Sequence, residues 1–574
     1  MRSPFLFGSF EIEIYNWLMN QEAAGASEQI FSNCKSLSFK NIPHQSKLFL
    51  DFQENPPQLN KFYPERQIEL KDFADKVLES YKVDRDNLCD ILEETNKVFS
   101  VSKKTLENIK LLREKDSVAI VTGQQAGLFS GALYTIYKAL SAVKLAEDLR
   151  KENIKAVPVF WIAEEDHDFG EVKKTYEIDK EGKLAEFENT PQSYTENLPV
   201  GLVELDETIE ETVENLFENL PHTEFTGEIK QILSETYKSG ETFSIAFAKF
   251  LAKIFSNYGV IFISPLNEKL KKLCAPVFVE AVEKSDDIVA ALLERSKELT
   301  DENYQAQVLV EKDSFPFFYQ DKNGERQALR RDLENGKIKI YKSRQSFEKS
   351  ELADIARNSP QNLSPNALLR PVVQDFLLPT LVYVGGAAEI AYFAQNSAIY
   401  KILNRPVTPI RHRTSFTVIE PKHRRTLEKY NLKFTDLFDG KEDILAKVIE
   451  KYISKETVRI FVEVEKAINT QLNRLDRHLS ETEPTLSANS ANRKRKIIWH
   501  IGALRKKYHR AEILKNEIVH RRLENLFTTL LPHNALQERT INALTFLNLY
   551  GTNFIDWIYS AIETDEKGHQ ILYL

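Results

Sequence analysis

The sequence predicts an α/β protein in which helices cover both faces of a parallel sheet, joined to a long helical arm. Between residues 117 and 410, short apolar runs alternate with segments of helical periodicity, as in a parallel sheet with crossover helices. Glycines follow two of these runs, where a strand is expected to give way to a helix. After Pro421, apolar residues recur about every 3.5 positions, which indicates long packed helices. At 574 residues the chain is too long for one ordinary core, so a second unit is expected.

The composition is that of a globular protein, with 42% hydrophobic and 28% charged residues. The net charge of -8 argues against bulk binding of nucleic acid. Cys34, Cys89 and Cys274 are far apart, which argues against a disulfide framework or a structural zinc site and fits a reducing cytoplasm. Glu11 and Glu13 interrupt any apolar segment of a signal peptide, and no run of about 18 apolar residues predicts a membrane span.

The core is predicted over residues 37–420, after an N-terminal extension over residues 1–36 for which Met19 is an alternative start. Helices are predicted within residues 67–115, over 131–150, over 243–255 and after Gly386, because apolar residues recur there at helical spacing. The apolar runs predicted to be strands are residues 117–122, 156–163, 259–264, 380–384 and 406–410.

Two blocks are predicted to be insertions into this core. Residues 170–225 contain a hairpin-like stretch, TYEIDKEGKLAEFE, and acidic loops. Residues 304–345 read as a small antiparallel meander, with turns at Asp321-Lys322-Asn323-Gly324 and at Asn335-Gly336.

The arm is predicted over residues 421–540, and residues 541–574 are expected to return to the core. Two long helices should pack as an antiparallel hairpin, joined by a loop at Pro484 and the run SANSAN. The basic run at residues 493–496, RKRK, then lies at this joint. It fits a solvated helix start, and a polyanion-binding patch is the alternative.

The first segment that can carry chemistry is VTGQQAGLFSGALYTIYKAL, residues 121–140. A strand, a glycine turn and a helix present backbone N–H groups to an anion in open α/β sheets. The glycine spacing matches neither the dinucleotide fingerprint nor the P-loop. Gln124 and Gln125 can donate and accept hydrogen bonds, which suits a ribose, phosphate or amide. A purely structural strand-to-helix turn explains the segment equally well.

The second segment is WIAEEDHDFGEV, residues 161–172. The ionisable residues from Glu164 to Asp168 cluster where a parallel strand should end, which is where such sheets bind ligands. His167, between Asp166 and Asp168, can carry a proton, and the carboxylates can hold Mg²⁺. A solvated acidic loop is the alternative, and the apolar strand before the cluster favours a functional site.

The third and fourth segments follow the later strands. Arg370 can bind a carboxylate or phosphate through two hydrogen bonds. Glu389, Tyr392 and Gln395, three residues apart, are expected on one face near a helix start; a solvated polar face is the alternative. In RPVTPIRHRTSFTVIE, residues 405–420, the cationic stretch around Arg413 can meet polyphosphate or can be a hinge into the arm.

Together the four segments resemble one family, the bacillithiol biosynthesis cysteine-adding enzymes, also described as cysteine ligases. The resemblance extends over residues 37–574. The segments that carry it are TGQQAGLFSGALYTIYKA at 122–139, PVFWIAEEDHDF at 158–169, SPNALLRPVVQDFLLPTLVYVGGAAEIAYFAQ at 364–395 and PVTPIRHRTS at 406–415.

The resemblance implies a Rossmann-like core similar to class I aminoacyl-tRNA synthetases and nucleotidyltransferases, with a coiled-coil arm that forms a homodimer. The implied reaction adds cysteine to glucosaminyl malate through an amide bond between the cysteine carboxyl and the sugar amine. Because a free carboxylate is a poor acyl donor, ATP or ADP is the expected cofactor, with Mg²⁺ as the candidate metal. No membrane and no nucleic-acid partner is expected.

Within this hypothesis, Asp166, His167 and Asp168 surround the reacting centre, and His167 carries the proton. The expected nucleotide- and substrate-binding residues are Gly123, Gln124, Gln125, Gly127, Tyr134, Lys138, Asn366, Arg370, Gly385, Gly386, Glu389, Tyr392, Gln395 and Arg413.

Two other functions compete with this one. A class I-like amide ligase or nucleotidyltransferase with a different acceptor is compatible with the same residues, because pocket shape sets the acceptor. A non-catalytic RNA-binding or scaffold protein would use the arm, with the basic run as its only support. The glycine spacing argues against a nicotinamide-dependent dehydrogenase.

Overall fold

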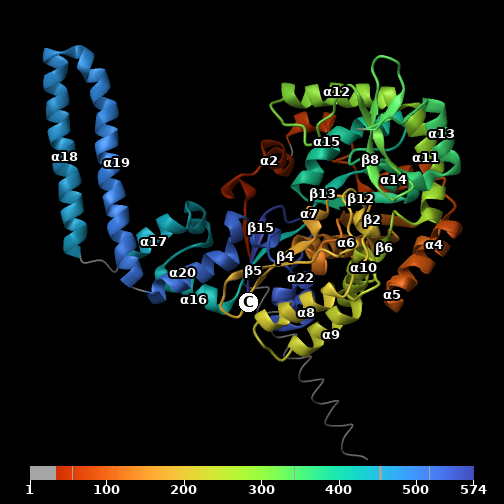
Figure 1. The fold of residues 1–574 in the computed structure, drawn as a ribbon, viewed down its shortest axis with the longest axis horizontal. Helices are drawn as coiled ribbons and strands as arrows, with labels where there is room; N and C mark the ends of the chain where they lie inside the picture. The colour runs from red at the N-terminus through yellow and green to blue at the C-terminus, as the bar shows by residue number, and fades with distance from the viewer. Residues whose placement is uncertain (1–33, 55, 342, 451–454, 516) are drawn as a thin grey trace, which may run out of the picture. The chain divides into compact units, whose positions relative to one another are not determined.

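The computed structural model describes residues 34–54, 56–341, 343–450, 455–515 and 517–574 (Figure 1). Its contacts separate two compact units. The core unit comprises the described residues up to Val418 together with Gln537–Tyr573, and the helical unit comprises Ile419–Leu536 with Leu574. The predicted extension lies outside the described residues up to position 33, while Cys34 to Ser36 lie in a strand of the core unit.

The centre of the core unit is a five-stranded parallel sheet, and this confirms the predicted α/β class. Its spatial order is β13 (Ile410–His412), β12 (Thr380–Gly385), β2 (Val118–Gln124), β3 (Ala156–Ile162) and β6 (Ile261–Ile263). The strands are nearly continuous apolar runs because helices cover both faces of such a sheet.

Packing on one face shows why these runs are so apolar. Val118 and Ile120 of β2, Leu381 of β12 and Phe73 of α3 (Leu70–Ser80) are all fully buried in one cluster. Leu145 of α6 (Tyr134–Lys151), the helix that connects β2 to β3, packs into the same cluster. Each such side chain contributes on the order of 2 kcal/mol by leaving water.

Four predicted strands are confirmed, and the fifth is shifted. Residues 406–410 were expected to be a strand, but β13 begins at Ile410. Pro406 and Pro409 have no N–H to donate to a ladder, so pairing with β12 begins after them. The predicted helices are present as α3, α4 (Arg85–Val98), α5 (Lys103–Leu112), α6, α10 (Phe243–Ile254) and α15 (Ala387–Ile402).

The first insertion contains the predicted hairpin, β4 (Lys174–Ile178) with β5 (Leu184–Glu188). A loop follows the hairpin over residues 189–199, whereas the acidic stretch beyond it forms α8 (Thr208–Asn219). Ile209, Val213 and Leu216 form a buried stripe at helical spacing, and the acidic residues occupy the opposite face. The short helix α7 (Phe169–Val172) precedes the hairpin, and α9 (Thr226–Thr236) follows α8.

The second insertion is an antiparallel sheet, as predicted, with the order β10-β9-β8-β7-β11. Both predicted turns contain a glycine in the left-handed region, Gly324 at φ 83° and Gly336 at φ 77°. The strands are β7 (Ser314–Gln320), β8 (Arg326–Arg331), β9 (Ile338–Ile340), β10 (Ser346–Phe347) and β11 (Leu363–Pro365). The core unit also contains the helices α2 (Lys47–Glu54), α11 (Glu268–Glu283), α12 (Ser285–Asp301), α13 (Lys349–Asn358) and α14 (Arg370–Leu377).

The helical unit contains the predicted antiparallel hairpin, α18 (Lys455–Thr482) and α19 (Pro484–Lys515), which lie side by side in Figure 1. Phe461 and Tyr508 pack across it, with ring centroids 5.8 Å apart.

The prediction of a loop over residues 487–492 is wrong, because α19 begins at Pro484 and runs through these residues. Proline is well suited to a first helical position. The basic run therefore lies inside α19, not at the joint. The unit also contains α16 (Pro421–Tyr430), α17 (Lys441–Glu450) and α20 (Glu517–Leu530).

No helix within the described ranges is long and apolar enough to cross a membrane.

The C-terminal segment returns to the core unit and packs against the turn that follows β2. It contains α21 (Leu544–Tyr550), α22 (Asn553–Ala561) and β15 (His569–Tyr573), and β15 lies between β1 (Cys34–Leu37) and β14 (Ser415–Ile419). Asn542 is fully buried, and its amide donates to the backbone oxygens of Phe129 at 2.8 Å and Leu128 at 3.2 Å. Its Oδ1 accepts from the Ser130 hydroxyl at 3.2 Å.

This contact stabilises an unfavourable backbone. Phe129, Ser130 and Gly131 all have positive φ, at 52°, 89° and 67°. Only glycine adopts such a conformation at low cost, so the two buried side chains before it need external support. Asn542 supplies that support.

Replacing Asn542 by alanine should destabilise the core unit by about 2–4 kcal/mol, because the Phe129 carbonyl loses its donor and the strained turn loses the contacts with Ser130 and Leu128. Urea unfolding of the wild type and N542A measures the loss. The matched control is Asn323→Ala in an exposed turn, with an expected change within about 0.5 kcal/mol. Equal losses in the two variants would contradict this role of Asn542.

Candidate functional site

A cavity of about 330 Å³ lies at the carboxyl ends of the central strands. From β2 the chain proceeds through β3 and β6 to one edge of the sheet, whereas β12 and β13 lie on the other side of β2. The order of strands thus reverses between β2 and β12, and open α/β sheets bind ligands at such a switch point. The volume is at the lower end of the range for small-molecule sites.

Most of the predicted binding residues meet in this cavity. Those that line it are Gly123, Gln124, Gln125, Tyr134, Lys138, Asp166, Arg370, Gly386, Glu389, Tyr392 and Arg413. The predicted residues that are not part of the lining are Gly127, His167, Asp168, Asn366, Gly385 and Gln395.

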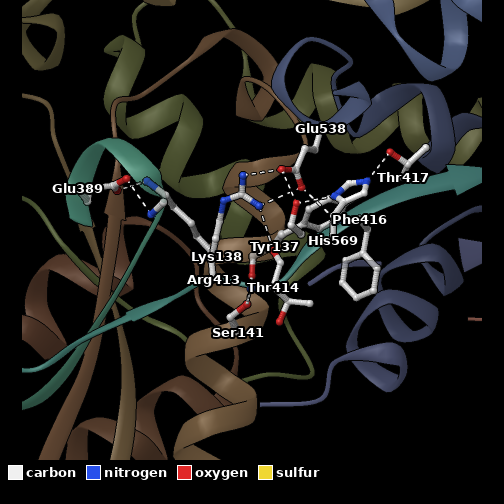
Figure 2. Close-up of polar contacts among 12 residues, drawn as sticks. Tyr137, Lys138, Ser141, Glu389, Arg413, Thr414, Phe416, Thr417, Glu538 and His569 are labelled. Carbon is white, nitrogen blue, oxygen red and sulfur yellow. Dashed lines mark hydrogen bonds and ion pairs between the residues drawn. The ribbon is translucent and has the colours of Figure 1, made fainter. Parts of the chain in front are cut away.

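A buried ion pair in the cavity lining joins the helices that follow β2 and β12 (Figure 2). The ammonium of Lys138, on α6, contacts the carboxylate of Glu389, in the first turn of α15. Lys138 also donates to Gln124 Oε1 at 2.8 Å and to the Gly123 backbone oxygen at 3.1 Å. Burial alone would raise the pKa of Glu389, but Lys138 lowers it, so the carboxylate is ionised and the pair is internally neutral.

Arg370 forms no hydrogen bond or ion pair with any carboxylate of the described residues, although the charge of Glu389 acts on it from nearby. Its guanidinium donates to the Tyr392 hydroxyl at 2.7 Å and to Gln374 Oε1 at 3.3 Å, and both acceptors are neutral. Burial raises the pKa of Tyr392 to about 12, so this phenol carries no compensating charge at neutral pH. The positive charge of Arg370 is therefore available to an anionic ligand.

Asp166 is the acid of the second segment that reaches the cavity. Gln125 donates to its Oδ2 at 2.8 Å, and the backbone N–H of His167 donates to its Oδ1 at 2.8 Å. The nearest cation is Arg326, with 3.9 Å between Nη1 and Oδ1. A half-exposed carboxylate oriented by an amide and a backbone N–H can bind an amine or accept a proton from one.

The predicted proton carrier, His167, lies beside the cavity and not in its lining. Its Nδ1 is 3.2 Å from Nη1 of the buried Arg326, and its ring meets Phe318 edge-on at 5.9 Å. Burial, and then Arg326, lower the pKa of His167, so the imidazole is neutral at pH 7. Because Arg326 can only donate, Nδ1 must be the acceptor in this contact.

The other acids of the cluster serve the fold or face solvent. Glu164 is buried and accepts from the Ser264 hydroxyl and from the Leu266 N–H. Glu165 forms a buried ion pair with Lys271 at 2.7 Å. Asp168 is exposed. Chain position alone placed all five ionisable groups at the strand end, and only Asp166 points into the cavity.

The glycine pattern had suggested an anion site at the start of α6, and there the backbone bonds the C-terminal segment. The Leu133 N–H donates to the Ile541 backbone oxygen at 2.9 Å, and Ala132 bridges to Asn542. Gly127 packs inside the turn, where a Cβ would lie 2.8 Å from the Gly131 Cα. The helix start that faces the cavity is that of α15, through Ala387 and Ala388.

Three other residues predicted to bind ligand instead have structural roles in the backbone near the cavity. Gly385 has no room for a side chain, since a Cβ would lie 2.8 Å from the Glu389 Cβ. Asn366 Oδ1 accepts from the N–H groups of Leu368 and Leu369 at the entry to α14. Gln395 is buried on a different side of α15 and bonds both backbone groups of Val308. A separation of six residues turns about 240° around a helix, which explains why it leaves the face of Glu389.

Arg413 reaches the cavity from a buried polar network (Figure 2). Its guanidinium makes two hydrogen bonds to the Glu538 carboxylate, at 2.7 and 2.9 Å. Burial alone would raise the pKa of Glu538, but Arg413 lowers it to about 2. The Ser415 hydroxyl donates to the same carboxylate at 2.7 Å and lies 2.7 Å from Nδ1 of His569.

Comparison with known families matches the whole described chain. A family model described as "Bacillithiol biosynthesis BshC, N-terminal Rossmann-like domain" matches residues 33–414, and one described as "Bacillithiol biosynthesis BshC, C-terminal coiled-coil domain" matches residues 416–574. The chain belongs to the bacillithiol biosynthesis BshC family.

Relatives in this family share about a third of their residues with the chain. A protein of Koribacter versatilis is 33% identical over 91% of this chain and 96% of its own length, and one of Solibacter usitatus is 32% identical over 94% and 99%. Both are named "Putative cysteine ligase BshC". A solved structure from Campylobacter jejuni, named a "putative arginyl t-RNA synthetase", covers 80% of this chain and 97% of its own at 11% identity. Its TM-score of 0.22 is too low to inform the fold.

The cavity also contains residues that the sequence did not indicate: Trp161, Ala163, Ala367, Tyr383, Ala387, Ala388 and Arg539. All but Arg539 lie inside the segments that carried the family resemblance, at strand ends or helix starts. Arg539 comes from a region expected to belong to the arm, and no local pattern links it to the sheet. The preceding residue, Glu538, accepts from Arg413, and this contact holds Arg539 beside the sheet.

In the part of the chain that the structure describes, no three His, Cys, Asp or Glu side chains gather as metal ligands.

The pH dependence of stability should reveal His569. Burial lowers its pKa to about 4 from the ordinary 6.5, so the unfolded chain takes up a proton between these values while the folded chain does not. Stability should therefore fall as pH falls from 6.5 towards 4, by up to about 3 kcal/mol from this residue.

Urea unfolding at several pH values between 7 and 5 measures the effect, and His569→Gln should make the dependence shallower by about one proton. The carboxyl of Glu538 contributes only below pH 4.5, outside this range, and His412, whose pKa burial lowers to about 3, contributes equally to the wild type and the variant. A variant with the same slope as the wild type would exclude His569 as the titrating group.

Proposed function

We propose that the chain catalyses the step that completes bacillithiol: formation of an amide between the cysteine carboxyl and the amine of glucosaminyl malate, driven by ATP. Membership of the BshC family supports this proposal, as do the names of the relatives. The observation that carries it is the cavity at the switch point, where the uncompensated Arg370 and the accessible acid Asp166 face one space.

These charges fit the substrates. All three substrates carry anionic groups, and cysteine and the amino sugar also carry an ammonium. Arg370 can bind a carboxylate or phosphate, and Asp166 can bind an ammonium. The residues also fit the phosphates of ATP, because the start of α15 presents the positive end of a helix dipole at Ala387 and Ala388. ATP supplies the activation that a free carboxylate lacks.

Asp166 is the proposed general base. The sugar amine is protonated at neutral pH and must lose a proton before its nitrogen attacks the carboxyl carbon. Asp166 can accept that proton, and Gln125 holds its carboxylate in place at 2.8 Å. His167 faces Arg326 instead, so the role of proton carrier first assigned to it passes to Asp166.

The test is mass spectrometry of a reaction with cysteine, glucosaminyl malate, ATP and Mg²⁺. The wild type should form bacillithiol, and Asp166→Asn should lower kcat by about 10² to 10⁴, the usual effect of losing a general base. Asp168→Asn, at an exposed position two residues away, should change kcat less than threefold. Whether AMP or ADP accumulates identifies the activation chemistry.

Two results would reject the assignment. Equal activity of the wild type and D166N would exclude Asp166 as the base. Absence of bacillithiol, together with amide formation on another amine, would favour a class I-like ligase with a different acceptor.

We also propose that the helical unit forms the homodimer. The hairpin consists of only two helices, so each helix has a face that the other does not cover. Apolar side chains on α18 and α19 are therefore exposed, among them Ile460, Val462, Leu504 and Trp499, which is 67% exposed. Such a surface favours burial against a partner, and a second copy of the same hairpin is the partner that is always present.

Substituting Trp499 and Leu504 by glutamate should shift the chain from dimer to monomer in analytical ultracentrifugation, because the charges would be buried in the interface. The control is Leu333→Glu, at a position of the core unit that is 63% exposed. A wild type that sediments as a monomer at micromolar concentration would refute the dimer.

A further inference from the structure

The cations in the cavity differ in whether a carboxylate neutralises them. Lys138 pairs with Glu389, and Arg413 pairs with Glu538. Arg370 contacts only neutral acceptors. Arg539 also lines the cavity, and no described residue pairs with it or accepts a hydrogen bond from it. After internal pairing, the lining retains two cations against the single carboxylate of Asp166, so it favours a ligand with net negative charge.

The backbone before Arg539 is firmly anchored. Glu538 is 2% exposed and accepts from Arg413, from the Ser415 hydroxyl and from the Phe416 N–H. Gln537 is fully buried and pairs with both backbone groups of Val418, at 2.8 and 3.1 Å. These contacts fix the position of Arg539 while its own side chain is exposed to the cavity.

We propose that Arg539 binds an anionic oxygen group of a substrate, a carboxylate or a phosphate, and so completes the binding site from the C-terminal segment. This inference rests on the proposed function, whose acceptor carries the two carboxylates of malate and whose ATP carries a triphosphate. The guanidinium has a rigid fork of N–H donors that matches either group through two parallel hydrogen bonds. Anchoring of the backbone reduces the entropy that such binding costs.

Steady-state kinetics of the full chain tests the proposal. Arg539→Gln should raise the KM of one substrate about 10- to 100-fold, the usual range for a charge-assisted hydrogen bond, with a smaller change in kcat. Arg539→Lys should give an intermediate KM because it keeps the charge but not the fork. The matched control, Arg344→Gln, is exposed and distant in sequence from the cavity segments, and should leave every KM unchanged.

The KM values of the three substrates show which of them supplies the anionic group. A raised KM for glucosaminyl malate, but not for methyl glucosaminide, assigns a malate carboxylate. A raised KM for ATP assigns a phosphate, and a raised KM for cysteine assigns its carboxylate. Unchanged KM values for all three substrates would overturn the proposal.

A separate measurement keeps this test distinct from failure of the proposed function. If the wild type forms no bacillithiol, isothermal titration with glucosaminyl malate and with ATP still reports on Arg539. R539Q must not differ from the wild type in its urea midpoint. If R539Q then binds either ligand more weakly, the result supports the role of Arg539, even though the proposed reaction is rejected. Equal binding by wild type and R539Q, or no binding to the wild type, overturns it.

Discussion

The buried pair of Glu538 with Arg413 is the interaction on which the rest of the site depends. Both side chains are almost inaccessible, at 2% and 6%, and a single buried charge without its partner costs several kcal/mol. The pair holds the segment from Gln537 to Asn542 against β13 and β14. This segment places Arg539 in the cavity, caps the start of α6 through Ile541 and supports the strained turn through Asn542. One ion pair therefore connects the C-terminal residues to the geometry of the strand ends.

The two glycine-containing turns, after β2 and after β12, differ in their surroundings because of this arrangement. Both turns join a sheet strand to a helix, and sequence pattern alone gives them the same anion-binding potential. At the start of the first helix, α6, the Leu133 N–H donates to Ile541 of the C-terminal segment, and Ala132 bridges to Asn542. The second, α15, begins at the cavity and carries the acid of the Lys138 pair in its first turn. In the proposed function, an anionic group therefore faces the start of α15, and the side of α6 contributes Gln124, Gln125 and Lys138 to the cavity.

Sequence pattern predicted the sheet and the region of the site, because strand runs and helix starts are local signals. It predicted the direction of individual side chains less well. Asp166 and Glu165 are adjacent, yet one reaches the cavity and the other pairs with Lys271 in the interior. Gln395 shared a spacing with Glu389 but leaves its helix face, and His167 faces Arg326. Arg539 was out of reach of any local pattern, since its position is set by a contact with Arg413 more than a hundred residues earlier.

The pairing of β1 with β15 joins Cys34 to Leu572, almost the full length of the chain. Contacts of such long sequence separation form late, because loop closure must be completed before they contribute. On the ribosome, the parallel sheet from β2 to β13 can assemble before residues 537–574 have been synthesised, since domains fold from the N-terminus as it emerges. Until then, the strand ends lack both the Ile541 contact at the start of α6 and the partner of Arg413. A chain without residues 537–574 would therefore contain the sheet but lack Arg539 in the cavity, the partner of Arg413 and the support that Asn542 gives to the turn after β2.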